Sequence, residues 1–179
     1  MTRQQTSERF KKNHQAFLEY MQSLTESEFM HSSNSKWTPG QQLAHVSLCL
    51  DPLAQVLQVK QVIESKFGRT TRKSLSYTNV ISNYHAALEK GGKAPERFVP
   101  EEIAWSKRDE LMTAIRENVK KVIQSMGNYT DVELDSLLLP HPLLGNLTIR
   151  EMLYLMAYHV SHHQENTRMN LNQNLKGLL

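Results

Sequence analysis

The sequence has little that would indicate a secreted, nucleic-acid-binding or membrane-spanning protein. It has one cysteine, Cys49, so no disulfide can form within the chain, and this fits a reducing compartment. The formal net charge is only +3 and the basic residues are scattered, whereas nucleic-acid-binding proteins usually have a dense basic patch. No apolar run approaches the length of a membrane span, and the polar N-terminus has no signal core. We therefore expect a soluble cytoplasmic protein that binds neither nucleic acid nor membrane.

Alternating runs of β-branched residues, the usual sign of strands, are almost absent as well. Apolar residues instead recur at spacings of three and four, which is typical of helices. This pattern covers four segments, at about residues 7–30, 38–65, 106–126 and 148–172. The 179 residues fit one domain, 1–179, with enough chain to bury a core. The sequence thus predicts an all-α fold, a single four-helix bundle.

Short motifs indicate where two of these helices begin. Thr38 and Gln41 can form a capping box, and Thr148 and Glu151 can form a second one. Pro52 lies inside the second helical segment, where its missing N–H predicts a kink.

The connections between the predicted helices differ in length. A short loop joins the first and second helices, so we expect them to be antiparallel neighbours. About 35 residues, 66–100, separate the second and third helices, and residues 78–89 within them could form a short helix. Such a long crossover allows the second and third helices to run parallel.

A histidine pair in the last helix is the first sign of a metal site. His159 and His163 are four residues apart, which places both rings on one helix face, within reach of one ion. Met152, Leu155 and Met156 share this face, so it should point into the bundle. Such a pair is also common by chance, and buried histidines often serve only as hydrogen-bonded core residues.

The same helix face becomes polar after the histidines. It continues to Asn166 and Asn170, which is typical of a core that opens into a pocket. His162 lies about 80° from the centre of the face, so we expect it to flank the site. Asn166, Asn170 and His162 are therefore candidate polar groups of a substrate pocket.

A third candidate ligand, His45, lies in the second helix. Apolar residues follow it at helical spacing, so it should also face inward. Three neutral imidazoles with an open fourth position are the pattern of a catalytic or substrate-accepting metal centre. Such a site suits a first-row divalent ion, and imidazole as a ligand does not select one metal among them. We expect zinc or nickel, with manganese as the less favoured candidate. Cys49, one turn after His45, could add a soft ligand or line the pocket, although a lone cysteine on an apolar face is usually a core residue.

The other histidines are not predicted ligands. We interpret His141, next to Pro142, as a structural loop residue, although it could approach the open end of the site or cap a helix. His14, His31 and His85 have no partner at helical spacing, so we expect them on the surface.

Three stretches of the sequence resemble the DinB-like superfamily, which includes YfiT-type metal-dependent hydrolases and bacterial thiol transferases. They are residues 37–45 (WTPGQQLAH), 91–95 (GGKAP) and 141–166 (HPLLGNLTIREMLYLMAYHVSHHQEN). The resemblance implies an up-down-down-up four-helix bundle with the long crossover between helices 2 and 3. It also implies a metal site formed by His45, His159 and His163, and it is compatible with a homodimer.

The chemistry of such a site depends on what occupies the open metal position. A metal held by neutral histidines can lower the pKa of a bound water, which leads to hydrolysis, or of a bound thiol, which leads to thiol transfer. No convincing general base is present, because Val160 stands where zinc proteases have glutamate, and Asp51 and Glu165 lie off the ligand faces.

The sequence favours a metal-dependent transferase or hydrolase that acts on a small molecule, with a low-molecular-weight thiol as the candidate ligand of the open position. One alternative is a non-catalytic, stress-related protein that binds a metal or a small molecule. The other is a structural domain whose histidines are core residues.

Overall fold

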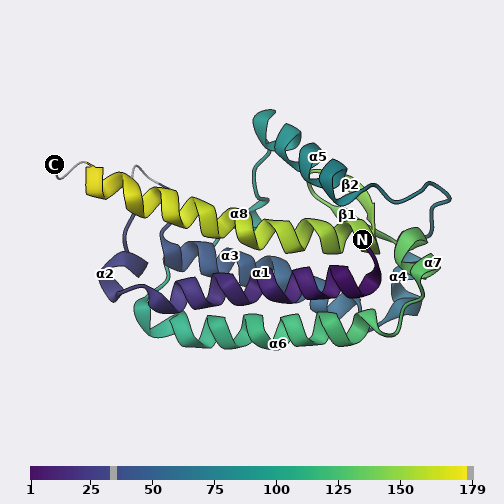
Figure 1. Cartoon of the computed structure of the whole chain (residues 1–179), viewed down its shortest axis with the longest axis horizontal. Coiled ribbons are helices and arrows are strands. Elements are labelled where there is room, and N and C mark those ends of the chain that lie inside the picture. The colour runs from purple at the N-terminus through teal and green to yellow at the C-terminus, as the bar shows by residue number, and fades with distance from the viewer. Residues whose placement is uncertain (33–35, 177–179) are drawn as a thin grey trace.

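The computed structural model describes residues 1–32 and 36–176, and within them four long helices form a bundle (Figure 1). These are α1 (Arg3–Ser23), α3 (Pro39–Val56), α6 (Arg108–Met126) and α8 (Ile149–Lys176). The colours along the ribbons show that α1 and α8 run in one direction and that α3 and α6 run in the other (Figure 1). The predicted up-down-down-up four-helix bundle is therefore confirmed. No helix in the described part of the chain is long and apolar enough to cross a membrane.

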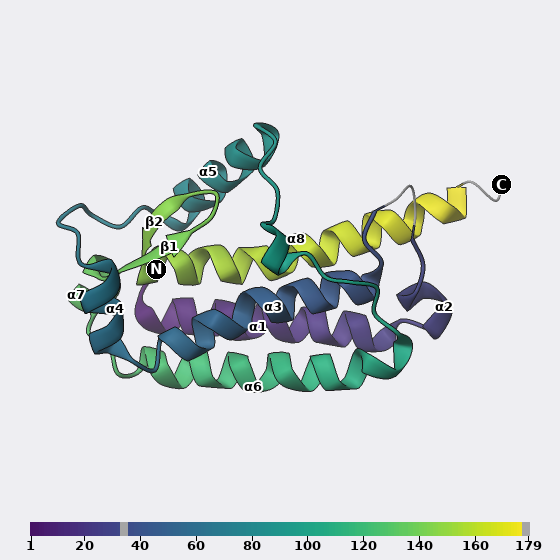
Figure 2. The same cartoon turned by 180° about the vertical axis from the view of Figure 1, so that it is seen from behind.

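The helices pack in an order that the sequence did not reveal. Both α1 and α3 pack against α6 and α8, so α1 and α3 lie diagonally across the bundle. They are antiparallel, but they are not the neighbours that the short loop predicted. The connection between them carries a short helix, α2 (Glu26–Phe29), at the end of the bundle (Figure 2). This connection has enough residues to reach the diagonal position.

Both predicted capping boxes are present. The Thr38 hydroxyl accepts a hydrogen bond from the Gln41 N–H at 3.1 Å, and Gln41 Oε1 accepts one from the Thr38 N–H at 3.0 Å. Thr148 and Glu151 form the same reciprocal pair at the start of α8. These bonds satisfy N–H groups that have no partner within the helix.

Two of the predicted helices are each divided in two. The segment predicted over 7–30 breaks after α1, where Thr25 caps the separate helix α2. The segment predicted over 38–65 continues through Pro52 and restarts after a turn as α4 (Lys60–Phe67). The apolar pattern runs across both breaks because each short helix also buries an apolar side chain.

The crossover from α4 to α6 passes over the outside of the bundle. It holds α5 (Tyr77–Glu89), which confirms the predicted short helix, and the 3-10 turns η1 (Glu96–Phe98) and η2 (Trp105–Lys107). α5 packs against α8 outside the four-helix bundle (Figure 1). The crossover therefore covers the side of the bundle that α3 and α8 form.

A short antiparallel hairpin precedes α8, where the sequence indicated only a loop. Strand β1 (Leu138–His141) pairs with β2 (Gly145–Thr148), and α7 (Asp131–Ser136) leads into them from α6. Leu139 lies opposite Leu147, and both side chains are buried. Strands of four residues are too short to show a convincing alternating pattern.

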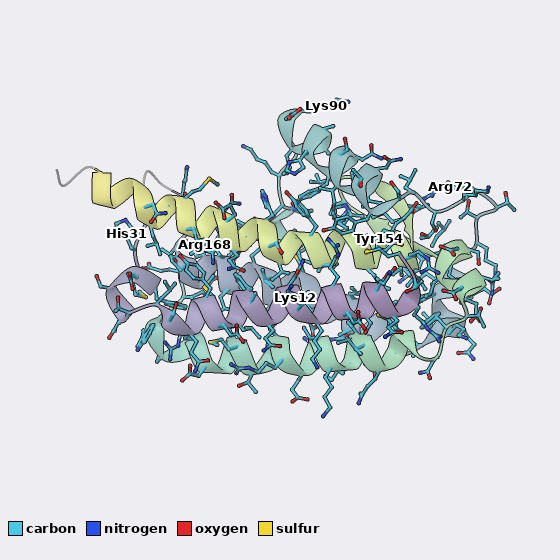
Figure 3. All side chains as sticks on the ribbon, viewed as in Figure 1. Lys12, His31, Arg72, Lys90, Tyr154 and Arg168 are labelled. Carbon is cyan, nitrogen blue, oxygen red and sulfur yellow. The ribbon has the colours of Figure 1, made fainter. Side chains whose placement is uncertain are left out.

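An ion pair between the exposed Arg72 and the buried Glu151 ties the crossover to the start of α8. The fully buried Glu151 carboxylate accepts hydrogen bonds from Arg72 Nη1 at 2.5 Å and Nη2 at 2.7 Å, and from the Leu75 N–H at 2.6 Å. Burial alone would raise the pKa of Glu151, but these bonds and the Thr148 N–H lower it overall. Arg72 comes from the connection before α5 (Figure 3), so this contact fixes the first part of the crossover to α8.

Candidate metal centre

Three histidine rings meet between α3 and α8. His45 lies on α3, and His159 and His163 lie on adjacent turns of α8, with 4%, 7% and 6% of each residue exposed. His159 Nε2 is 3.2 Å from His45 Nε2 and 3.0 Å from His163 Nε2. The fold therefore brings the three predicted ligands together, with ring nitrogens facing one another.

The other ring nitrogens of two of these histidines are held by oxygen acceptors. His45 Nδ1 is 2.7 Å from the carbonyl oxygen of Phe98, and His163 Nδ1 contacts Oε1 of Gln42. A carbonyl or amide oxygen can only accept, so both Nδ1 atoms carry the proton. The Nε2 atoms of these neutral rings consequently present lone pairs toward His159.

Hydrogen bonds among the three rings can pair only one of these two lone pairs, and the Cys49 thiol, 3.5 Å from His45 Nε2, is a weak donor within reach of the other. A neutral His159 has one N–H, so it can donate to only one of the two facing Nε2 atoms. Its own Nδ1 is buried and has no hydrogen-bond partner in the described part of the chain. A cation 2.0–2.1 Å from two nitrogens would separate them by about 2.9 Å at a right angle and about 3.3 Å at the tetrahedral angle. The spacings of 3.0 and 3.2 Å fit this range, so the donors suit a first-row divalent ion.

Burial keeps all three imidazoles in the neutral form that binds metal. It lowers the pKa of His45, and it lowers the pKa of His159 and His163 well below the ordinary value. Repulsion between the rings lowers the pKa of His159 and His163 further. Little proton competition therefore opposes metal binding near neutral pH.

Cys49 forms a second donor set with two of the same histidines. Its Sγ is 3.5 Å from His45 Nε2, one turn away on α3. Ligand atoms of His45, Cys49 and His159 all lie within 4.8 Å of one another, so this trio could hold a metal ion. Burial raises the pKa of the Cys49 thiol to about 12, so the thiol remains protonated unless a cation binds it.

A cavity of about 610 Å³ begins at the histidines and opens outward. His45, Cys49 and His159 line it, whereas His163 does not, and Met152 and Met156 line it along α8. The cavity therefore lies on the methionine side of the ligands. The sequence had indicated an opening on the opposite, asparagine side.

One of the four predicted pocket residues lines this cavity. Cys49 does so, whereas His162, Asn166 and Asn170 are not among its lining residues. Asn166 Nδ2 is instead 3.1 Å from His162 Nε2, and Asn170 is buried. The Trp37 ring stacks on the ring of His163, with the two ring centroids 6.4 Å apart.

Sequence reasoning missed the residues that orient the ligands. Gln42 lies one turn before His45 on α3, and this spacing could have placed it beside the site. The Phe98 carbonyl belongs to η1 in the crossover, 53 residues from His45 along the chain. It gave no sequence signal because every residue has a carbonyl.

His141 combines a structural role with a place in the cavity wall. It ends β1, and its Nδ1 accepts hydrogen bonds from the N–H groups of Leu143 and Leu144 at 3.2 and 3.3 Å. These bonds give it the predicted structural role in the turn. The ring also lines the cavity, and burial lowers its pKa to about 4.

The prediction that His14 lies on the surface is wrong. His14 is 1% exposed, it donates from Nδ1 to the Phe10 carbonyl at 2.8 Å, and burial lowers its pKa to about 4. Its position four residues after Phe10 on the apolar face of α1 was a signal for burial. His85 is exposed as predicted, with Nε2 2.6 Å from the Tyr158 hydroxyl, and His31 is half-buried.

We expect His14→Leu to flatten the acid dependence of stability. The unfolded histidine takes up a proton near pH 6.5, whereas the folded one does so only near pH 4. The stabilisation from this group is therefore complete above pH 6.5 and is lost as the pH falls from 6.5 to 4. Over this range the wild-type protein should lose up to about 3 kcal/mol of its free energy of unfolding through His14, and the variant should not show this loss.

Urea unfolding of metal-free protein between pH 7.5 and 4 measures this effect. His85→Leu, at an exposed histidine, is the control and should follow the wild-type profile. Parallel profiles for wild type and His14→Leu would show that His14 is not held neutral.

Comparison with known proteins is consistent with this fold. The sequence pattern of the DinB superfamily matches residues 9–166. No curated protein matches the sequence. A similar solved structure is the crystal structure of TT2238, a four-helix bundle protein, with a TM-score of 0.58 and 17% sequence identity, covering 94% of this chain and 99% of that chain. At this identity the likeness concerns the fold alone. The resemblance found in the sequence is confirmed, and the chain belongs to the DinB superfamily.

Proposed function

We propose that this protein is a metal-dependent transferase that acts on a small molecule and uses a low-molecular-weight thiol. The observation that carries the proposal is the convergence of three imidazole nitrogens between α3 and α8, where two of the rings, those of His45 and His159, line a cavity of about 610 Å³. A purely structural role for the histidines would rely on the weak Cys49 thiol donor to pair with His45 Nε2, and it would not explain why His45 and His159 line a cavity.

We propose His45, His159 and His163 as the ligands, with Cys49 beside them. The Nε2 lone pairs of His45 and His163 are set by the hydrogen bonds at Nδ1, so these rings are pre-oriented. The Cys49 thiol, in contrast, would first have to lose a proton. Three neutral ligands would leave the full charge of the ion available to an exogenous thiol.

The surroundings of the site favour thiol transfer over hydrolysis. When bound, the ion would stabilise a thiolate at its open position without a separate base. Among the described residues that line the cavity there is no aspartate or glutamate to activate water. Asp51 instead contacts Gln55 and Asn118, and Glu165 is exposed on α8.

A second candidate is a protein that binds a metal and a small molecule without turnover. The carboxylate-free lining of the cavity suits this function as well. An activity screen separates the two candidates, whereas metal content tests what they share.

We expect untagged wild-type protein to bind about one equivalent of zinc or nickel, measured by plasma mass spectrometry after equilibrium dialysis. His45→Ala, His159→Ala and His163→Ala should each abolish this binding, because each removes one of three protein ligands. Gln42→Leu should weaken it by about 10–100-fold, because His163 loses the partner that fixes its ring. Cys49→Ser should keep the metal.

His85→Ala is the matched control, because it removes a histidine outside the cluster. Loss of metal in Cys49→Ser as complete as in His159→Ala would show that the ligands are instead His45, Cys49 and His159. Wild-type protein that takes up none of zinc, nickel and manganese would contradict the metal site altogether.

We expect the metal-loaded protein to consume a low-molecular-weight thiol in the presence of an electrophilic acceptor, and to hydrolyse ester substrates much more slowly. A thiol panel with colorimetric detection of the free thiol measures this reaction, with His159→Ala as the inactive control. Ester hydrolysis without thiol consumption would contradict thiol transfer. Metal binding with neither activity would favour the binding protein.

A further inference from the structure

The cavity beside the histidines has apolar walls and a cationic edge. Its described lining residues include three cations, Lys66, Lys93 and Arg97, and no carboxylate. The apolar wall is formed by side chains from α3, the crossover, the hairpin and α8, among them Leu53, Phe67, Leu88, Leu139, Met152 and Met156. A lining of this kind suits a molecule with a hydrocarbon body and a negative charge.

The three cations are available to an external anion. All three side chains are exposed, and none forms an ion pair with a residue that the structure describes. Lys66 Nζ lies 5.6 Å from the Phe67 ring centre, and the Arg97 guanidinium lies 4.8 Å from that of Phe98. Both aromatic rings also line the cavity, so these contacts hold the charges at its edge.

Two polar groups in the wall are hydrogen-bond donors. His141 Nδ1 accepts two backbone N–H bonds, so the ring proton lies on Nε2, which makes no hydrogen bond with a described residue. The Tyr84 hydroxyl, also in the wall, likewise bonds to no described residue. Donors without carboxylates are what an anionic ligand requires.

We propose that the cavity binds an amphipathic anion, in which a hydrocarbon chain or ring carries one carboxylate or phosphate group. The hydrocarbon would lie against the apolar wall, and the anionic group would meet Lys93, Arg97 and Lys66. In the proposed reaction this molecule is the electrophilic acceptor: the thiolate sulfur forms a bond to one of its carbons, and the bond from that carbon to a leaving group breaks, with the electron pair going to the leaving group. The inference rests on the proposed function only in treating this cavity as the substrate pocket.

Calorimetric titration with eight-carbon probes tests this proposal on the full chain, both metal-free and metal-loaded. Octanoate should bind at least tenfold more tightly than octanol at low salt, and more tightly than octylamine. The advantage of octanoate should shrink in 0.5 M salt because screening weakens the attraction. Octyl phosphate shows which anionic group is preferred: tight binding of either anion supports the proposal.

Substitutions of exposed cationic side chains locate the binding site of the probe without removing any buried contact of the fold. Lys93→Ala combined with Arg97→Ala should weaken octanoate binding by about 5–10-fold and leave octanol binding unchanged. Lys11→Ala combined with Lys120→Ala is the matched control, because these exposed lysines lie on α1 and α6 away from the cavity. Equal affinities for octanoate and octanol, or equal effects of the two double variants, would overturn the proposal.

The same titration separates this proposal from the metal site. Octanoate binding that persists in a protein without metal uptake would contradict the proposed function and leave the pocket assignment standing. Metal binding without octanoate binding would contradict the pocket assignment alone.

Discussion

His45 and His163 each donate a hydrogen bond from Nδ1 to an oxygen acceptor, and the chemistry of the cluster follows from these two bonds. They direct the Nε2 lone pairs of both rings toward His159, whose single proton can pair with only one of them, which leaves the weak Cys49 thiol donor for the other. Burial disfavours the charged rings, so protonation does not resolve the conflict near neutral pH. A cation would pair with both lone pairs at once, and the nitrogen spacings are those that ligands of a first-row metal adopt.

The up-down-down-up topology supplies both acceptors. Gln42 lies on α3 beside His45, whereas the Phe98 carbonyl comes from the crossover that links the parallel helices α3 and α6. The ion pair of Glu151 and Arg72 fixes the start of this crossover to α8. The crossover, the hairpin and the two ligand-bearing helices also form the walls of the cavity. The orientation of His45 and one wall of the pocket thus depend on the same long connection.

Much of the fold and of the candidate site could be predicted from the sequence, because helical periodicity and capping depend on residues close together in the chain. The spacing of His159 and His163, the apolar face and the capping box at Thr148 follow from neighbours within one or two turns. The diagonal placement of α1 and α3, the side on which the cavity opens and the Phe98 acceptor depend on how distant segments pack, so they could not be predicted. His14 was misplaced although its spacing from Phe10 indicated burial. The homodimer and the cytoplasmic location stay predictions.

X-ray absorption spectroscopy of the zinc-loaded protein, without added thiol, tests the central claim most directly. The account predicts three imidazole nitrogens at about 2.0–2.1 Å and no sulfur in the first coordination shell. A sulfur at about 2.3 Å that disappears in Cys49→Ser would contradict it, because the protein would then supply the thiolate itself.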